Sequence, residues 1–275
     1  MERKKLVEII FEKKSFLCVG LDSDIDKIPH FLRSEKDPIF SFNKEIIDAT
    51  IDYAVAYKPN MAFYESLGSK GWASLEKTMD YLKSKSPDIF TIADAKRGDI
   101  GNTAEMYAKA FFDNLGFDSV TINPYMGSDS ITPFLSRKGK WAIILGITSN
   151  KGAEDFQFLD MNQGSGKKLY AEVIDKAMSL GSDENIMFVA GATQANLLVK
   201  IREIVPSAFL LVPGVGAQGG SLQEVCRYGM TKDCGLLVNA SRSILYASNK
   251  NDFSEKARNA AQELQNEMSQ ILDNK

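Results

Sequence analysis

The chain has 275 residues and a formal net charge of -3, and its lysines and arginines are spread along the sequence. It therefore has no basic segment of the kind that binds nucleic acid, and no stretch approaches the roughly 18 consecutive apolar residues of a membrane-spanning helix. The length accommodates one large α/β domain or two smaller ones.

The cysteine and histidine content excludes several kinds of site. Three cysteines without a CxxC pair favour a reducing compartment. Because the N-terminal segment is charged rather than apolar, we expect no signal peptide and a cytoplasmic location. His30 is the single histidine, so a Ser-His-Asp triad or a multi-histidine metal site would depend on it alone. We interpret His30 as a surface residue and expect no bound metal.

In chain order, a short helix is expected over residues 2–14, followed by eight apolar runs with helical patterns between them. The 3.6-residue period of apolar side chains predicts helices at 39–51, 70–85 and 102–115. A last helix is expected to begin at Asp252, where the order Asp-Phe-Ser-Glu resembles a capping box. The expected strands are 16–21, 53–57, 89–93, 119–124, 141–147, 186–190, 209–212 and 235–238.

The alternation of strands and helices indicates a parallel sheet, and continuous apolar runs fit strands that are covered on both faces. Eight such units in a chain of this length match an α/β protein of the (β/α)₈ TIM-barrel class, with one domain over residues 1–275. No linker or low-complexity tract divides the sequence. The one long irregular stretch, residues 150–166 after the fifth run, is expected to be a lid or a binding loop.

Polar residues collect at the carboxyl ends of the predicted strands. Active sites of (β/α)₈ barrels lie at these ends, so the residues there are the first candidates for function. One polar strand end is expected by chance, but two lysines and two aspartates on the first three ends favour a functional site. The candidates are Asp22, Lys58, Asp94, Lys96, Ser149, Pro213 and Arg242.

The segment Asp94–Ile100 is the centre of the candidate site. Residues two apart in a strand share a face, so Asp94 and Lys96 are expected to point the same way, with Asp99 on the turn that follows. An ammonium between two carboxylates stays protonated, which makes Lys96 a poor base and a suitable proton donor. The alternative interpretation is a solvated cluster of ion pairs that only holds structure.

A glycine-rich segment, residues 214–219, follows the seventh run and formally matches GxGxxG. A dinucleotide-binding domain would need an acidic residue after the next strand, where this chain has Asn239-Ala240-Ser241, and too little chain follows. We therefore interpret the segment as a phosphate-binding loop with free backbone N–H groups, and Arg242 as a cationic clamp. A plain loop with a solvated arginine is the alternative.

Together these motifs resemble the orotidine 5'-phosphate decarboxylase family, in its longer bacterial (type 2) subfamily. The family motif Asp-x-Lys-x-x-Asp stands here as residues 94–99, and DAKRGDIGNT, TINPYMG, GITSNKG, PGVGAQGG and NASRSI follow in the family's order over nearly the whole chain. The resemblance implies decarboxylation of orotidine 5'-phosphate to UMP, the last step of de novo pyrimidine biosynthesis, without a cofactor or metal.

The resemblance also implies a catalytic array of two lysines and two aspartates. Lys96 would protonate C6 of the pyrimidine as carbon dioxide leaves, and Asp94 would lie against the substrate carboxylate. Lys58 would complete the alternating charges and contact the ribose. Asp99 would reach into the site of the neighbouring subunit, so the resemblance implies a homodimer.

Further residues are implied to bind the substrate. Ser241 stands where many relatives have glycine, but its contribution would be a backbone N–H, so the difference changes little. The implied assignments are Asp22 for a ribose hydroxyl, Ser149 for the pyrimidine amide, Pro213 and Val215 for the walls around the base, Gln218 and Arg242 for the phosphate, Ser241 through its N–H, and Ile100 and Thr103 beside Asp99.

Two other functions are compatible with parts of this pattern. Sugar-phosphate lyases that resemble 3-keto-gulonate-phosphate decarboxylase or hexulose-phosphate synthase use a similar Asp-x-Lys-x-x-Asp motif with a magnesium ion. Ser149 and the long loop after it favour a pyrimidine ligand instead. A nucleotide-binding protein without catalysis is the second alternative, against which the full set of charged residues argues. We expect no nucleic-acid or membrane partner.

Overall fold

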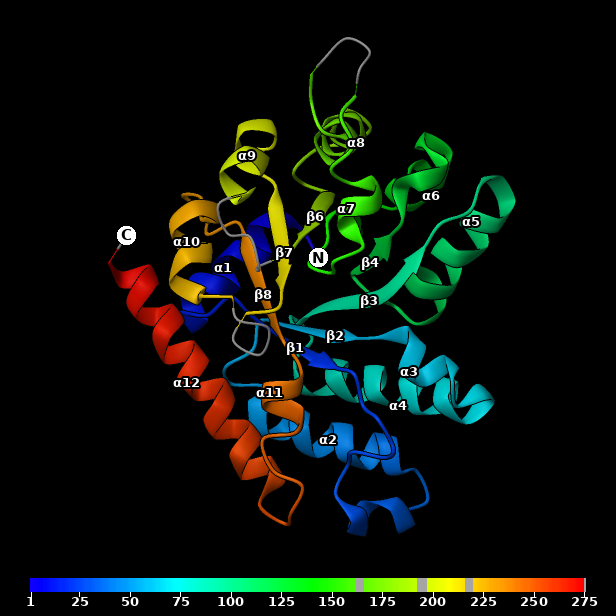
Figure 1. Ribbon diagram of the computed structural model, residues 1–275. Coiled ribbons are helices and arrows are strands. Elements are labelled where there is room, and N and C mark those ends of the chain that lie inside the picture. Colours follow the sequence, from blue (N-terminus) through cyan, green and yellow to red (C-terminus); the bar gives the residue numbers. More distant parts are fainter. Residues whose placement is uncertain (162–165, 192–196, 216–219, 275) are drawn as a thin grey trace.

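The computed structural model describes residues 1–161, 166–191, 197–215 and 220–274 (Figure 1). Eight parallel strands close into a barrel in which each strand pairs with the next along the chain and β8 pairs with β1. The predicted (β/α)₈ barrel is confirmed. The strands are β1 (Leu17–Leu21), β2 (Ala56–Pro59), β3 (Phe90–Arg97), β4 (Ser119–Ile122), β5 (Trp141–Ile147), β6 (Ile186–Ala190), β7 (Phe209–Pro213) and β8 (Leu236–Ala240).

Helices surround the barrel, and those predicted from periodicity are present. The predicted helix at 102–115 changes at Lys109 into a π-helix that ends at Asn114. The stretch 150–166, expected to be irregular, contains the short helix α7. Short 3₁₀ segments cover His30–Ser34, Pro124–Met126 and Ser128–Ser130. The α-helices in the described part of the chain are α1 (Arg3–Lys13), α2 (Pro38–Thr50), α3 (Met61–Glu65), α4 (Gly68–Lys85), α5 (Gly101–Ala108), α6 (Thr132–Leu135), α7 (Ala153–Phe156), α8 (Leu169–Met178), α9 (Leu197–Ile204), α10 (Leu222–Gly229), α11 (Arg242–Leu245) and α12 (Phe253–Asp273).

Two predicted strand boundaries differ from the structure by three residues or more. The prediction starts the second strand at residue 53, but Tyr53 and Ala54 donate their N–H groups to Thr50 O and complete the turn after α2, so β2 begins at Ala56. The prediction ends the third strand at residue 93, but β3 continues to Arg97. The extension consists mostly of charged residues, so a search for apolar runs does not predict it.

The last helix begins where it is predicted, but the predicted capping box is wrong. Asp252 occupies the N-cap position of α12 without a side-chain hydrogen bond to the helix. Its Oδ1 instead accepts a hydrogen bond of 2.6 Å from Ser248 Oγ. The carboxylate therefore closes the preceding loop and does not cap the first turn.

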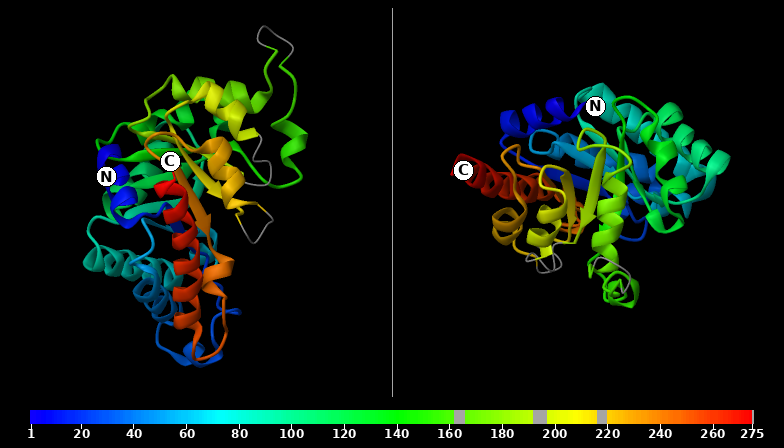
Figure 2. Two further views of the ribbon diagram at one scale, coloured as in Figure 1. Left: turned by 90° about the vertical axis from the view of Figure 1, so that its left-hand side faces the viewer. Right: turned by 90° about the horizontal axis from the view of Figure 1, so that it is seen from above.

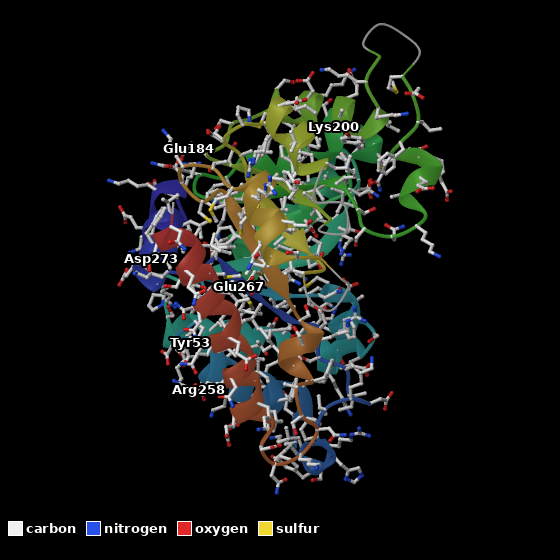
Figure 3. The ribbon with its side chains drawn as sticks, turned by 60° about the vertical axis from the view of Figure 1, so that its left-hand side comes forward. Tyr53, Glu184, Lys200, Arg258, Glu267 and Asp273 are labelled. Atoms are coloured by element: carbon white, nitrogen blue, oxygen red, sulfur yellow. The ribbon has the colours of Figure 1, made fainter. Side chains whose placement is uncertain are left out.

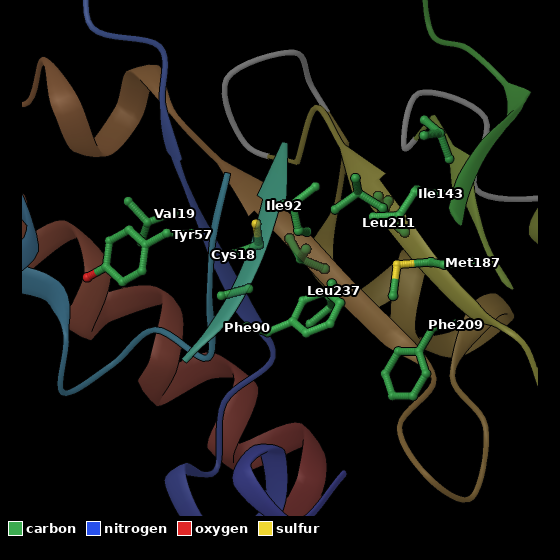
Figure 4. Close-up of a cluster of buried hydrophobic side chains, with 14 of the residues drawn as sticks. Cys18, Val19, Tyr57, Phe90, Ile92, Ile143, Met187, Phe209, Leu211 and Leu237 are labelled. Atoms are coloured by element: carbon green, nitrogen blue, oxygen red, sulfur yellow. The ribbon is translucent and has the colours of Figure 1, made fainter. Parts of the chain in front are cut away.

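Aromatic side chains fill the end of the barrel where the strands begin (Figure 4). Trp141 of β5 is fully buried, and its ring meets Phe90 of β3 and Phe209 of β7 edge-on, with centroids 6.0 and 6.2 Å apart. Such edge-to-face pairs stabilise a core beyond the burial of area alone. This end of the barrel is therefore a packed core, and the opposite strand ends are left for a site.

The C-terminal helix α12 packs along the outside of the barrel, where its last turns lie beside α10 (Figure 2). At its other end, Phe253 stacks on Phe42 of α2 with ring centroids 5.4 Å apart. The Arg258 guanidinium lies over the Tyr53 ring at 5.3 Å (Figure 3). The chain beyond the eighth strand thus covers α2 and holds it against the barrel. None of the described helices is both long and apolar enough to cross a membrane.

Candidate active site

Three strand ends bring Asp22, Lys58 and Asp94 together. The Lys58 ammonium lies 2.8 Å from Asp94 Oδ2 and 3.9 Å from Asp22 Oδ1, and only 4% of Lys58 is exposed. Burial alone would lower the pKa of Lys58, but the charges of Asp94 and Asp22 outweigh it and raise that pKa above its usual value. The lysine is therefore a fixed cation that does not act as a base.

Lys96 extends this arrangement to a fourth charge. Its ammonium lies 2.5 Å from Asp94 Oδ1, while its side chain is half exposed. Burial would raise the pKa of Asp94, but Lys58 and Lys96 together hold it well below its usual range. Asp94 stays ionised between two ammonium groups, and the charges alternate from Asp22 through Lys58 and Asp94 to Lys96.

The backbone around Lys96 is irregular. Lys96 has φ +48°, in the left-handed region that side chains other than glycine rarely adopt. Its N–H donates a 2.8 Å hydrogen bond to Thr121 Oγ1, and the same hydroxyl lies 3.1 Å from Asp94 Oδ1. Asp94 and Lys96 approach each other as predicted, but the reason is a bulge between the strands and not the simple alternation of a strand.

Asp99 lies away from the other three catalytic candidates in this chain. Its Oδ1 accepts a hydrogen bond from the N–H of Ile100, and within the described residues it forms no ion pair with Lys96. Ile100 is 47% exposed and Thr103 is exposed on the first turn of α5. The single chain therefore does not place Lys96 between two carboxylates, contrary to the prediction from the segment alone.

A cavity of about 180 Å³ opens beside the charge array, formed by the ends of five strands. Asp22 Oδ1 is buried there without a hydrogen-bond partner in the described structure, so a hydroxyl donor would satisfy it. Arg242, at the first position of α11, is exposed at the cavity wall. The cavity is lined by Asp22, Lys58, Asp94, Pro213, Gly214, Val215, Asn239, Ala240, Ser241, Arg242 and Ser243.

The predicted binding residue Ser149 is not brought to this cavity. Ser149 lies in the loop after β5 and is not among the lining residues. That loop is held by Gln157, whose Oε1 accepts a 2.9 Å hydrogen bond from the N–H of Thr148. Gln218 lies outside the described residues. The structure thus brings together Asp22, Pro213, Val215, Ser241 and Arg242 with the lysines and Asp94.

Of the polar residues at the site that the sequence reasoning missed, two lie within strands. Asn239 of β8 lines the cavity, and its amide donates to Ser241 Oγ at 3.2 Å. That hydroxyl occupies the space above Gly20, where a Cβ would lie 1.8 Å from it, so a side chain at position 20 would force Ser241 to move. Thr121 is the second missed residue. In both cases the available signal was a polar side chain inside an apolar strand pattern.

His30 is exposed, as the sequence predicts. In the described part of the chain, no three His, Cys, Asp or Glu side chains are grouped so that they could hold a metal ion. Both oxygens of Asp94 are already bonded to ammonium groups.

Comparisons with known proteins agree with the barrel fold. The chain matches the orotidine 5'-phosphate decarboxylase / HUMPS family over residues 15–257. It is 59% identical over 273 residues to the orotidine 5'-phosphate decarboxylase of Christiangramia forsetii, with 99% of each chain covered. It is 58% identical over 275 residues to that of Flavobacterium johnsoniae, with 100% of each chain covered. The solved structure of Leishmania donovani OMP decarboxylase has a TM-score of 0.82 at 35% identity, covering 99% of this chain and 100% of that chain.

The fold and the site define a class of barrel enzyme in which fixed charges of alternating sign are held at the strand ends. Within that class, the chain belongs to the orotidine 5'-phosphate decarboxylase / HUMPS family. The family expected from the motifs is confirmed, and with it the expected class of enzyme, a carboxy-lyase.

Proposed function

We propose that this protein decarboxylates orotidine 5'-phosphate to UMP, the last step of de novo pyrimidine biosynthesis, with Lys96 as the proton donor to C6. The observation that carries the proposal is the alternating array of Asp22, Lys58, Asp94 and Lys96 beside a cavity that reaches Arg242. The full-length relatives that bear this enzyme's name support the substrate.

The charge array accounts for the two events at C6, the loss of carbon dioxide and the protonation. Asp94 is held ionised, so a substrate carboxylate beside it is repelled, and this repulsion ends as carbon dioxide leaves. The electron pair of the broken carbon–carbon bond stays on C6, where the ammonium of Lys96 delivers a proton. Lys58 keeps Asp94 and Asp22 in place, so the charges need little reorganisation during the reaction.

The cavity accounts for the rest of the substrate. Asp22 Oδ1, which lacks a hydrogen bond in the described structure, accepts a ribose hydroxyl, and Pro213 and Val215 pack against the base. Arg242 binds the phosphate, and a phosphate held away from the reacting carbon supplies binding energy for the reaction. We propose that Gln218 and the backbone N–H of Ser241 also bind the phosphate. Ser149 is proposed to bind the pyrimidine amide.

We also propose that the active form is a homodimer in which Asp99 completes the partner's site, with Ile100 and Thr103 beside it. Exposed apolar side chains near the carboxyl ends of β3 and β4 support this, because large apolar groups at a surface favour contact with another protein. They are Ile100 (47% exposed), Met106 (56%), Tyr125 (87%) and Met126 (50%).

Residues 1–275 are proposed to act as one domain, since α12 packs on the barrel. Cys18, Cys226 and Cys234 are buried and form no disulfide, which supports a cytoplasmic location, where thiols stay reduced.

The proposal is tested by incubating the purified protein with orotidine 5'-phosphate or with 3-keto-gulonate 6-phosphate, each once with magnesium and once with EDTA. In the presence of EDTA, absorbance should fall with orotidine 5'-phosphate, because the array needs no metal. The sugar phosphate should not be converted. Turnover of the sugar phosphate that EDTA abolishes would favour the magnesium-dependent lyase. Tight binding of UMP without turnover of either compound would favour a nucleotide-binding protein.

A further inference from the structure

Thr121 lies in β4 opposite an irregularity in β3. Between two regular pairings of these strands, three residues of β3 (94–96) face the single β4 residue Thr121. A bulge of this kind bends the strand that carries it and re-aims its side chains. The residues of the bulge include Asp94 and Lys96, so the irregularity decides where two of the four charges point.

The hydroxyl of Thr121 bonds to both ends of this bulge. It accepts the backbone N–H of Lys96 at 2.8 Å, and its own proton can be donated to Asp94 Oδ1 at 3.1 Å. The carbonyl of Ala93, at 3.5 Å, is the other acceptor in reach. A carboxylate at the shorter distance makes the stronger bond. Thr121 is 1% exposed, so water does not compete for these bonds.

The bond to Lys96 supports a backbone conformation that is unfavourable on its own. Lys96 has φ +48°, and a non-glycine residue stays in that region only where its surroundings hold it there. A backbone N–H turned out of the strand ladder also needs another acceptor. Thr121 supplies that acceptor from the neighbouring strand. The 2.5 Å contact between the Lys96 ammonium and Asp94 therefore depends on a side chain of β4.

We propose that Thr121 is a positioning residue of the charge array, whose hydroxyl holds the bulge that aims Lys96 and Asp94. The inference rests on the proposed function, because it concerns the same site. Thr121 acts through Asp94 and Lys96 and is assigned no contact with substrate. Its loss misplaces the proton donor, while the cavity residues of β7 and β8 that bind the nucleotide are unchanged.

The test compares Thr121→Val, which keeps the shape of the side chain without the hydroxyl, with Thr121→Ser, which keeps the hydroxyl. Because small misplacements of reacting groups are costly, kcat of Thr121→Val should fall at least about tenfold, with KM changed by less than about threefold. Thr121→Ser should keep kcat within about threefold of wild type, since it retains both hydrogen bonds.

Ser119→Ala is the matched control. Ser119 lies on the same strand, is fully buried, and donates to Thr91 O of β3 at 3.0 Å. It makes no described contact with Asp94 or Lys96, so its substitution should lower Tm and leave kcat unchanged. If Thr121→Val does not fold, Thr121→Ala takes its place in the comparison.

Crystal structures of wild type and Thr121→Val give a readout that does not require activity. Lys96 is expected to leave its positive φ in the variant and to lose its contact with Asp94. A folded Thr121→Val variant with kcat within about twofold of wild type would overturn the proposal, as would equal impairment of Thr121→Ser. An unchanged Lys96 backbone in Thr121→Val would also overturn it. A wild-type protein without decarboxylase activity would instead refute the proposed function, and the structural comparison would still test the role of Thr121.

Discussion

The ammonium of Lys58 lies 2.8 Å from Asp94 Oδ2, and only 5% and 11% of the two side chains are exposed. Removal of one partner from such a pair leaves a charge buried without compensation. The pair is therefore both a part of the proposed reaction and a determinant of stability, and the two roles can be measured separately.

The first prediction concerns stability and pH. The pKa of Asp94 is depressed in the folded protein, so its contribution to stability is complete above the unfolded pKa of about 3.9 and is lost as pH falls toward the folded value. Asp94→Asn should lower the free energy of unfolding at pH 7 by about 1 to 3 kcal/mol. The difference from wild type should shrink as pH falls below about 4.

Urea titrations at pH 7 and about pH 3 measure this difference. Asp26→Asn is the surface control, because the Asp26 side chain is exposed, and its effect should be small at both values. If the loss in free energy of unfolding of Asp94→Asn is the same at both pH values, the ion pairs of Asp94 are not its cause.

The second prediction concerns the proton donor. Lys96→Ala should fold and lose almost all activity, because general acid catalysis alone contributes about 10² to 10⁴ in rate and the charge array is broken as well. Circular dichroism verifies the fold and an absorbance assay measures turnover. Activity above about a tenth of wild type is incompatible with Lys96 as the donor, since even the smallest expected contribution is larger.

The third prediction concerns the proposed dimer. Lys96→Ala and Asp99→Ala should each be inactive alone, but a mixed dimer carries both lesions in one site and neither in the other. When the two variants are mixed in equal amounts and their subunits exchange at random, the mixture should regain up to about a quarter of wild-type activity. Exchange is verified by native mass spectrometry. If mixed dimers form and no activity returns, Asp99 acts within its own subunit.

The fourth prediction concerns Arg242. Loss of a charge-assisted contact with a phosphate dianion should reduce kcat/KM of Arg242→Ala for orotidine 5'-phosphate at least about tenfold, or 1.4 kcal/mol. Wild type and variant should be equally slow on orotidine, which lacks the phosphate. A structural arginine would differ, because its loss would lower both activities in proportion and reduce Tm.

The apolar runs were sufficient to predict the barrel, because strands buried on both faces leave a continuous signal in the sequence. They could not reveal the bulge at residues 94–96, where the hydroxyl of Thr121 in β4 accepts the N–H of Lys96. Asp252 shows the same difficulty at a helix end. The pattern predicts that its carboxylate caps the helix, but the carboxylate accepts a hydrogen bond from Ser248 instead. Local patterns thus predicted the elements, while contacts between distant residues decided how the side chains are used.

The candidate site, too, could be predicted only in part from the sequence. Asp22, Lys58 and Asp94 were found from their positions after apolar strands, and the barrel brings those positions together. The approach of Lys96 to Asp94 was predicted for the wrong physical reason, as its backbone shows. The place of Asp99 could not be derived from strand geometry, because the turn carries it away from Lys96 in this chain.

The most direct test of the central claim is proton NMR of the purified protein with orotidine 5'-phosphate and EDTA in D₂O. Because the exchangeable ammonium of Lys96 carries deuterium in this solvent, the predicted product is UMP with deuterium at C6, formed together with one equivalent of carbon dioxide. Recovery of unchanged orotidine 5'-phosphate from folded, dimeric protein would contradict the account.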